Sequence, residues 1–144
     1  MGYQDFKGKR VIVTGASQGI GLAVAKQLLF HGAQVIALDI AFDAVLDKKI
    51  KPDPDGMFRL HLDISKRQSI KPLIDEIEHQ LGAIDYLASV AGILRMSALL
   101  EHTEQDWLDT FDVNCHGPFI LCQAVAKHMK VRGEGAIVAV GSNA

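Results

Sequence analysis

The chain has few cysteines and no recognisable metal-binding motif, and both shortages exclude classes of protein. Its two cysteines, Cys115 and Cys122, stand two turns apart on one expected helix, about 10 Å along the axis. That separation is too long for a disulfide, so we expect two free, buried thiols rather than a disulfide scaffold. The six histidines form no His-x-x-x-His motif and the cysteines no Cys-x-x-Cys motif, so no metal site is expected.

Charge and hydropathy exclude further partners. The 144 residues carry 15 Lys and Arg against 17 Asp and Glu, a net charge of −2. With this charge we do not expect a nucleic acid as a partner. No apolar run is long enough to span a bilayer, and residues 1–7 lack the apolar core of a signal peptide, so we expect no membrane contact and a cytoplasmic location. With 49% hydrophobic and 22% charged residues, the composition is that of one globular domain over 1–144.

What the chain does contain is a glycine-rich stretch, Thr14-Gly15-Ala16-Ser17-Gln18-Gly19-Ile20-Gly21. It joins a short β-branched run, 10–13, to a run with apolar residues at helical spacing, 20–29. Such a turn binds anions, because the unpaired N–H groups and the dipole of the helix face the ligand and glycine lets the backbone approach it. The spacing Gly-x-x-x-Gly-x-Gly is not a P-loop, since no Gly-Lys-Ser/Thr follows. The candidate phosphate-binding residues are Gly15, Ser17, Gln18, Gly19, Ile20 and Gly21.

Apolar strands alternate with helices along the rest of the chain. The expected strands are 10–13, 34–38, 57–62, 84–88 and 136–140. The expected helices are 20–29, a short one within 41–50, 65–81 and 104–131. The pattern Ser65-x-x-Gln68 predicts a capping box, and Pro72 predicts a kink or a late start of that helix. Thr103 is expected to cap the last helix.

This alternation predicts an α/β fold in which helices cover both faces of a parallel sheet. Right-handed crossovers and a glycine-rich first turn indicate a Rossmann-type doubly wound sheet with strand order 3-2-1-4-5. The carboxyl ends of its strands meet at one edge, where ligands bind. The residues that follow the strand ends are the glycine stretch, Asp39, Asp63, the segment 89–92 and Ser142. We therefore predict a single site along that edge.

Five features of this edge, in order and spacing, resemble the classical short-chain dehydrogenases/reductases over essentially the whole chain. They are Thr14-Gly15-x-x-x-Gly19-x-Gly21, Asp63, Ala91-Gly92, Asn114 and Ser142. The resemblance implies a nicotinamide cofactor bound by the glycine stretch, with Asp63 beside its adenine and Ala91 and Gly92 also in contact with it. It also implies that Ser142 holds the substrate oxygen and that Asn114 anchors a water in a proton relay, both as catalytic residues.

Asn114 has a mechanical feature of its own. Pro118 lacks the N–H that would bond the carbonyl of Asn114, so we expect a kinked helix with a free acceptor there. A kinked core helix without a chemical role is the alternative.

Asp39 bears on the choice of cofactor. A carboxylate at the end of the second strand can accept a hydrogen bond from a ribose 2′-OH and would repel a 2′-phosphate. Positions 16–18 and 40–41 carry no Lys or Arg, so we predict NAD rather than NADP. This disfavours a sugar or fatty-acyl reductase of the same family.

A narrower likeness concerns the substrate. The runs 91–96, 106–107, 111–114 and 135–138 are similar to family members that oxidise a cyclohexadiene diol acid to the catechol acid of siderophores. That likeness implies a small-molecule diol substrate, and Arg95 is a candidate to bind its carboxylate through a bidentate pair. A surface arginine is the alternative.

Two departures from the family pattern qualify this prediction. Ser89 stands where the family has an asparagine, and the Tyr-x-x-x-Lys pair expected after Ser142 lies outside residues 1–144, as do the family's last two strands. We therefore expect this sheet to be truncated, with 136–140 an exposed edge, and the 144-residue chain to have little or no dehydrogenase activity. The alternative is a catalytically inactive NAD-binding or interaction fragment.

The expected helix 104–131 is apolar on more than one face, which predicts burial on two sides. One side would face the sheet. The other would face a second copy of the chain, as the family's oligomers imply, or residues outside this chain.

Overall fold

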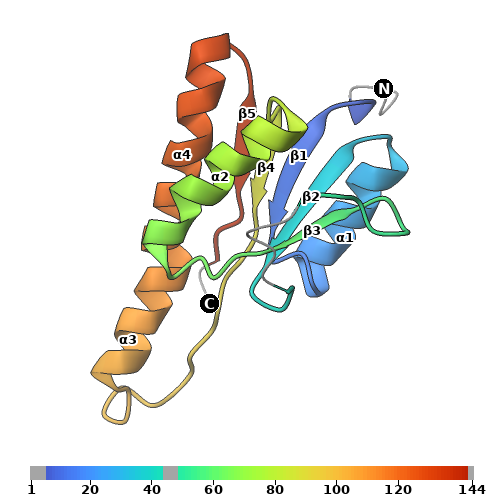
Figure 1. The fold of residues 1–144 in the computed structure, drawn as a ribbon. Helices are drawn as coiled ribbons and strands as arrows, with labels where there is room; N and C mark the ends of the chain where they lie inside the picture. Colours follow the sequence, from blue (N-terminus) through green and yellow to red (C-terminus); the bar gives the residue numbers. More distant parts are fainter. Residues whose placement is uncertain (1–5, 44–48, 143–144) are drawn as a thin grey trace.

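Five parallel strands form the centre of the structure, a computed structural model that describes residues 6–43 and 49–142 (Figure 1). The strands are β1 Arg10–Thr14, β2 Gln34–Asp39, β3 Phe58–His61, β4 Tyr86–Ser89 and β5 Ala136–Ala139. Their order in the sheet is β3-β2-β1-β4-β5, and all neighbouring strands are parallel. The predicted fold class and strand order are confirmed, and the strand ends differ from the expected ones by no more than two residues.

Helices cover both faces of the sheet. They are α1 Gly19–Phe30, α2 Arg67–Leu81, α3 Glu104–Phe111 and α4 Gly117–Arg132, with a π-helical turn, η2 Asp112–His116, between the last two. Figure 1 shows α1 on one face, α2 and α4 on the other, and α3 extending past the carboxyl edge of the sheet. The short helix expected within 41–50 falls mainly on 44–48, outside the described residues.

The ends of the helices follow the sequence with one exception. Gly32 and Gly82, with φ of +86° and +93°, follow the ends of α1 and α2 as expected. Thr103 caps α3, since its Oγ1 accepts the N–H of Asp106 at 3.0 Å. The capping box at Ser65 is wrong, because the Ser65 hydroxyl bonds to Asp63 at 2.7 Å and α2 starts late, at Arg67, with Pro72 inside it.

The core consists of two apolar layers, one on each face of the sheet. Successive residues of β1 alternate between them, because side chains of a strand point to opposite faces. Ile12 packs in the layer under α2 and α4, whereas Val11 and Val13 pack in the layer under α1. All three side chains are buried, which explains why β1 is apolar throughout.

The expectations for the last helix are met in part. Leu121 and Val125 are fully buried, whereas Phe119 is 63% exposed on the other face of α4. One apolar face therefore packs in the core, and the covering of the second face by a partner stays a prediction. The prediction of two buried thiols is wrong: Cys115, in η2, is exposed, and Cys122 is half-buried, which raises the pKa of its thiol.

No helix in the described part of the chain is long and apolar enough to cross a membrane. Within residues 6–43 and 49–142, no three His, Cys, Asp or Glu side chains gather as metal ligands.

Candidate functional site

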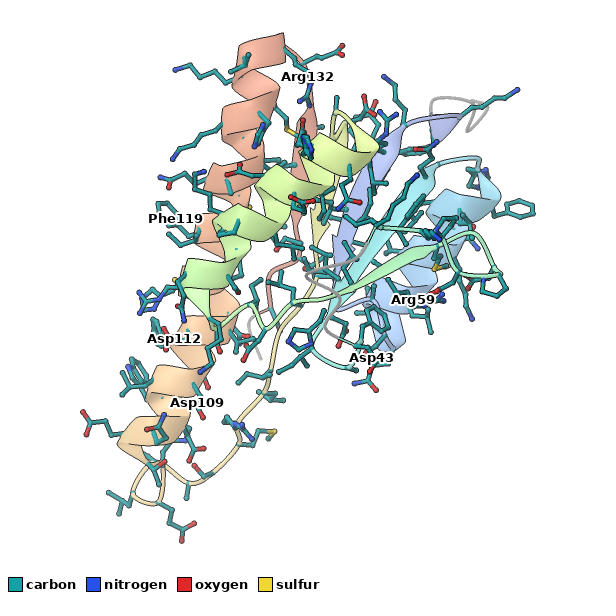
Figure 2. The ribbon with its side chains drawn as sticks, in the orientation of Figure 1. Asp43, Arg59, Asp109, Asp112, Phe119 and Arg132 are labelled. Atoms are coloured by element: carbon teal, nitrogen blue, oxygen red, sulfur yellow. The ribbon has the colours of Figure 1, made fainter. Side chains whose placement is uncertain are left out.

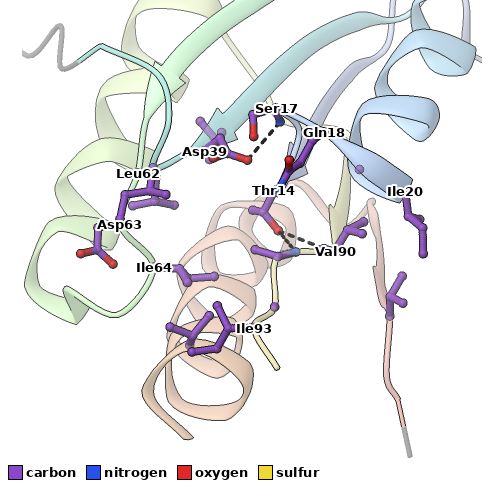
Figure 3. Close-up of a pocket in the computed structure, with 18 residues that line it drawn as sticks. Thr14, Ser17, Gln18, Ile20, Asp39, Leu62, Asp63, Ile64, Val90 and Ile93 are labelled. Carbon is purple, nitrogen blue, oxygen red and sulfur yellow. Dashed lines mark hydrogen bonds between the residues drawn. The ribbon is translucent and has the colours of Figure 1, made fainter. Parts of the chain in front are cut away.

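Two adjoining clefts open at the carboxyl edge of the sheet. The first, of 430 Å³, lies among the glycine stretch, the end of β2, and the loops after β3 and β4 (Figure 3). The second, of 790 Å³, lies among the loop after β4, the α3–η2 segment and the residues after β5. Both are lined by the segment 90–93 and by Val140, so a ligand in one cleft would lie beside a ligand in the other.

Packing explains two of the glycines after β1. A Cβ on Gly21 would lie 2.1 Å from the carbonyl oxygen of Gly15, far inside contact distance. Gly15 has a φ of +67°, and a Cβ there would lie 2.9 Å from the Cα of Ala91. A side chain at either position would therefore clash with backbone, and the two glycines let the turn pack closely between the start of α1 and the loop after β4. The turn and the first residues of α1 form the cradle, whose backbone suits a phosphate.

The N-terminus of α1 completes this cradle. Gln18 occupies the N-cap without a side-chain cap bond, and the first turn contains no acidic residue. Its unpaired N–H groups and the helix dipole therefore remain available to an anion. Gly19, a predicted member of the site, is not among the described residues that line the first cleft, whereas the other predicted members from the stretch line it: Gly15, Ser17, Gln18, Ile20 and Gly21.

Asp39 lies in the first cleft at the end of β2. Its Oδ2 accepts the N–H of Ser17 at 3.0 Å (Figure 3). Its Oδ1 accepts the N–H of Ala41 at 2.9 Å. Partial burial opposes ionisation, but these donated N–H groups outweigh it and hold the pKa of the Asp39 carboxyl below its usual value. The side chain is thus anionic at neutral pH.

The charge of the first cleft is negative. Asp63 lines it together with Asp39, and the described lining contains no Lys or Arg. Asp63 is also a turn residue, since its Oδ1 accepts the N–H of Ser65 at 3.0 Å. A ligand with an extra phosphate near Asp39 would meet repulsion and no compensating cation.

Thr14 connects the glycine stretch to the loop after β4. Its buried Oγ1 accepts the N–H of Val90 at 2.9 Å and that of Ala91 at 3.1 Å (Figure 3). These bonds bring Ala91 and Gly92 to the first cleft, as predicted. The sequence placed Thr14 in the glycine motif but predicted no role for it. A lone hydroxyl at the end of a buried apolar strand is nevertheless a sign that the hydroxyl has a hydrogen-bond partner.

Asn114 lies in η2, a π-helical turn just before Pro118, whereas the kink and the free Asn114 carbonyl expected here stay predictions. Its side-chain amide pairs with the backbone of Ile93: Oδ1 accepts the N–H and Nδ2 donates to the carbonyl, each at 2.8 Å. Asn114 therefore fixes the loop after β4 between the two clefts. The sequence indicated the residue but not this partner.

The second cleft brings together the remaining candidates. Asn114, Ser142 and Arg95 all line it, with Trp107, the single tryptophan of the chain. The Arg95 Nε lies 4.0 Å from Asp106 Oδ1, and its Nη2 lies 3.9 Å from Asp109 Oδ2. The structure thus places every predicted site residue except Gly19 on the wall of one cleft or the other.

The sheet order and the glycine turn at its carboxyl edge define a protein of the Rossmann fold, and comparison with known proteins narrows the class. The family described as short chain dehydrogenase matches residues 9–144. The chain is 35% identical to 2,3-dihydro-2,3-dihydroxybenzoate dehydrogenase of Bacillus subtilis (strain 168), over 100% of this chain and 56% of that protein. It is also 35% identical to NAD-dependent glycerol dehydrogenase of Listeria innocua serovar 6a, over 94% of this chain and 53% of that protein.

A solved structure agrees with these relatives. The ligand-free aldohexose dehydrogenase of Thermoplasma acidophilum matches with a TM-score of 0.84 and 28% identity, over 98% of this chain and 52% of that chain.

The chain belongs to the short-chain dehydrogenase family, whose members are oxidoreductases that typically bind a nicotinamide cofactor. It spans about half the length of the relatives that it matches. Their names specify an acidic diol, glycerol and an aldohexose, so membership by itself leaves the substrate open.

Proposed function

We propose that this chain serves the NAD-dependent oxidation of a secondary alcohol, with 2,3-dihydro-2,3-dihydroxybenzoate as substrate. The observation that carries NAD is the Asp39 carboxylate, which two backbone N–H groups hold in a cleft whose described lining has no Lys or Arg. The likeness to the enzyme of Bacillus subtilis, which extends over the whole chain, supports the substrate.

Each part of the site has a role in this proposal. When bound, the nicotinamide cofactor supplies the hydride acceptor. The glycine stretch and the N-terminus of α1 hold its diphosphate, and Asp39 accepts a hydrogen bond from the ribose. The first cleft is also lined by Asp63, Ala91 and Gly92. Ser142 orients the substrate hydroxyl in the second cleft.

Asn114 anchors the proton relay in this scheme and keeps the wall between the clefts in place through Ile93. Oxidation of a ring hydroxyl of the diol gives a ketone that tautomerises to 2,3-dihydroxybenzoate. The gain of aromaticity favours product, which suits a dehydrogenase that supplies catechol siderophores.

Two measurements test the proposal. Calorimetric titration of the 144-residue chain should show NAD binding at least tenfold more tightly than NADP, the size of effect expected from about 1.4 kcal/mol. NADH formation should then be followed with the coding product that includes whatever sequence continues past Ala144. The dihydrodiol acid should be oxidised faster than glycerol, threitol or an aldohexose, and preference for one of those would refute the substrate.

The second candidate is a catalytically inactive NAD-binding or interaction fragment. An interaction role is supported by the edge of the sheet, where Val138 of β5 is 63% exposed and Val140 just beyond is 52% exposed, since an open strand edge can pair with another chain. Reading the coding sequence past Ala144 separates the two. A Tyr-x-x-x-Lys pair soon after Ser142 supports the enzyme, and a stop codon supports the fragment. A family member with another substrate is the third candidate, and the substrate panel above identifies it.

We also propose a cytoplasmic homo-oligomer formed through the helices 104–131. Phe119 of α4 is 63% exposed and lines neither cleft, and such exposure is costly for a large apolar side chain in a monomer. Light scattering after gel filtration should give a multiple of the monomer mass. Phe119→Gln should lower that mass, whereas Phe30→Gln, at a phenylalanine of α1 that is even more exposed, should not.

A further inference from the structure

Arg95 is the one permanently charged side chain among the described residues that line the second cleft. Its guanidinium is held loosely, since the distances of 4.0 and 3.9 Å to Asp106 and Asp109 exceed those of hydrogen bonds. The side chain is half exposed and forms no hydrogen bond within the described part of the chain. Its N–H donors are therefore available to a ligand.

The two carboxylates that hold Arg95 are not part of the cleft wall. Neither Asp106 nor Asp109, which lies on α3 (Figure 2), is among the described residues that line the second cleft. Each also accepts another bond: Asp106 Oδ2 from the Thr103 hydroxyl at 2.6 Å, and Asp109 Oδ1 from Gln105 at 2.7 Å. The cleft thus presents a cation whose counter-charges lie outside it.

These distances decide which partner Arg95 prefers. Exposed ion pairs near 4 Å contribute little, because solvent screens them. A planar carboxylate in the cleft could instead take two short, charge-assisted hydrogen bonds from the guanidinium. Such a ligand would displace the loose contacts, against some competition from Asp109.

We propose that Arg95 sets the charge preference of the substrate cleft by binding the carboxylate of an acidic substrate, and that Asp109 holds the guanidinium and competes with that substrate. The inference rests on the proposed function for the diol. It goes beyond that function by naming the pair of residues that selects a diol acid over a neutral alcohol.

Two probes isolate this selection, because 2,3-dihydroxybenzoate and 2,3-dihydroxybenzamide differ in charge and little in shape. Both are titrated by calorimetry into the 144-residue chain with saturating NAD. The fluorescence of Trp107, which lines the same cleft, gives a second readout. The variants are Arg95→Gln and Asp109→Asn. The matched control is Arg67→Gln, which removes a comparable loose ion pair, 3.9 Å to Asp112, away from both clefts.

The two variants should move the acid-to-amide affinity ratio in opposite directions. The wild type should bind the acid about tenfold more tightly than the amide, as expected for a charge-assisted pair. Arg95→Gln should bring the ratio near one, and Asp109→Asn should raise it about two- to fivefold by removing the competitor. Arg67→Gln should leave it unchanged. Circular dichroism confirms that each variant is folded, and Arg95→Lys, which keeps the charge without the fork, should give an intermediate ratio.

A structural tether would behave differently, since breaking it from either side would lower the binding of both probes alike. Equal ratios in the wild type and Arg95→Gln, shifts of the same sign in the two variants, or no binding of either probe would overturn the inference. Its failure is distinct from that of the proposed function. If the protein prefers the acid but does not oxidise the dihydrodiol, only the proposed substrate is refuted. If it oxidises the dihydrodiol without a preference for the charged probe, only the role of Arg95 is refuted.

Discussion

Replacing Asp39 by asparagine should weaken the preference for NAD while leaving the cleft folded. The change is nearly isosteric and removes one negative charge from a side chain that accepts the N–H groups of Ser17 and Ala41. Asparagine keeps one acceptor oxygen and turns an amide NH₂ toward the other N–H, so one bond is lost. The expected loss in the free energy of unfolding is about 1–2 kcal/mol.

The effect on the cofactor follows from the charge. Two unit charges 4 Å apart repel by about 1 kcal/mol in water and by about 4 kcal/mol at an effective dielectric constant near 20. Asp39 is partly exposed, so we expect a penalty of about 1–3 kcal/mol against a 2′-phosphate. Removing this penalty should tighten NADP binding about 5- to 160-fold. NAD should bind several-fold more weakly, because a bond to the ribose is lost.

Titration of both cofactors into wild type and Asp39→Asn measures these changes. The gain for NADP should shrink at high salt, because ions screen the repulsion. Asp63→Asn is the matched control, since Asp63 is the other carboxylate of the same cleft. An unchanged NAD-to-NADP ratio, or equal effects of the two variants, would refute the electrostatic reasoning.

The pH dependence of folding gives an independent check on Asp39. Its pKa in the folded state lies below the ordinary value, so the folded protein favours the ionised form. The resulting stabilisation is complete above the unfolded pKa of about 4 and is lost as the pH falls through the folded pKa. Urea unfolding of wild type and Asp39→Asn should therefore differ most at neutral pH, and the difference should narrow below about pH 4. A constant difference would contradict the assigned pKa direction.

Three further changes test the packing at the site and an ion pair at the start of β3. Gly21→Ala places a methyl group 2.1 Å from the Gly15 carbonyl and should cost about 3 kcal/mol or more, with loss of NAD binding, whereas Gly141→Ala, in open space, should be neutral in thermal unfolding. Thr14→Val leaves the N–H groups of Val90 and Ala91 without their acceptor and should lower the free energy of unfolding in urea by about 2–4 kcal/mol. Thr110→Val, which removes a hydroxyl that donates a single bond, should cost less, and equal losses would contradict the role of Thr14. Arg59→Gln should raise the pKa of Asp55 from about 2 toward its ordinary value, because the hydrogen bond from the Arg59 guanidinium is the main cause of the low pKa. An unchanged NMR titration of Asp55 would refute this.

The strands and their order were predictable because β1 and β2 are buried on both faces. Their runs are therefore apolar without alternation, and each ends at a polar residue of the carboxyl edge, Thr14 and Asp39. The site could be placed for the same reason, since parallel strands bring their ends to one edge. This geometry follows from the local sequence of each strand and from the general right-handedness of crossover connections, so a single sequence is enough to predict it.

The predictions that failed depend on two things: competition between alternative hydrogen bonds, and contacts between residues that are distant in sequence. Ser65 had the spacing of a cap, but Asp63, two residues earlier, takes its hydroxyl and its N–H. The pairing of Asn114 with Ile93 spans 21 residues and requires knowledge of how the loop after β4 crosses the helix. The exposure of Cys115 follows from η2, whose π-helical geometry carries no pattern that apolar periodicity can reveal.

The π-helical turn η2 changes what the loss of a single residue does to this part of the chain. A π-helical turn accommodates one residue more than an α-helical turn, so the helices on either side keep their facing despite the additional residue. Loss of one residue from a regular α-helix instead rotates everything beyond it by about 100°. A deletion within 112–116 should therefore disturb the direction in which α3 faces less than a deletion within α4 would, and its main cost would be the displacement of Asn114 from Ile93.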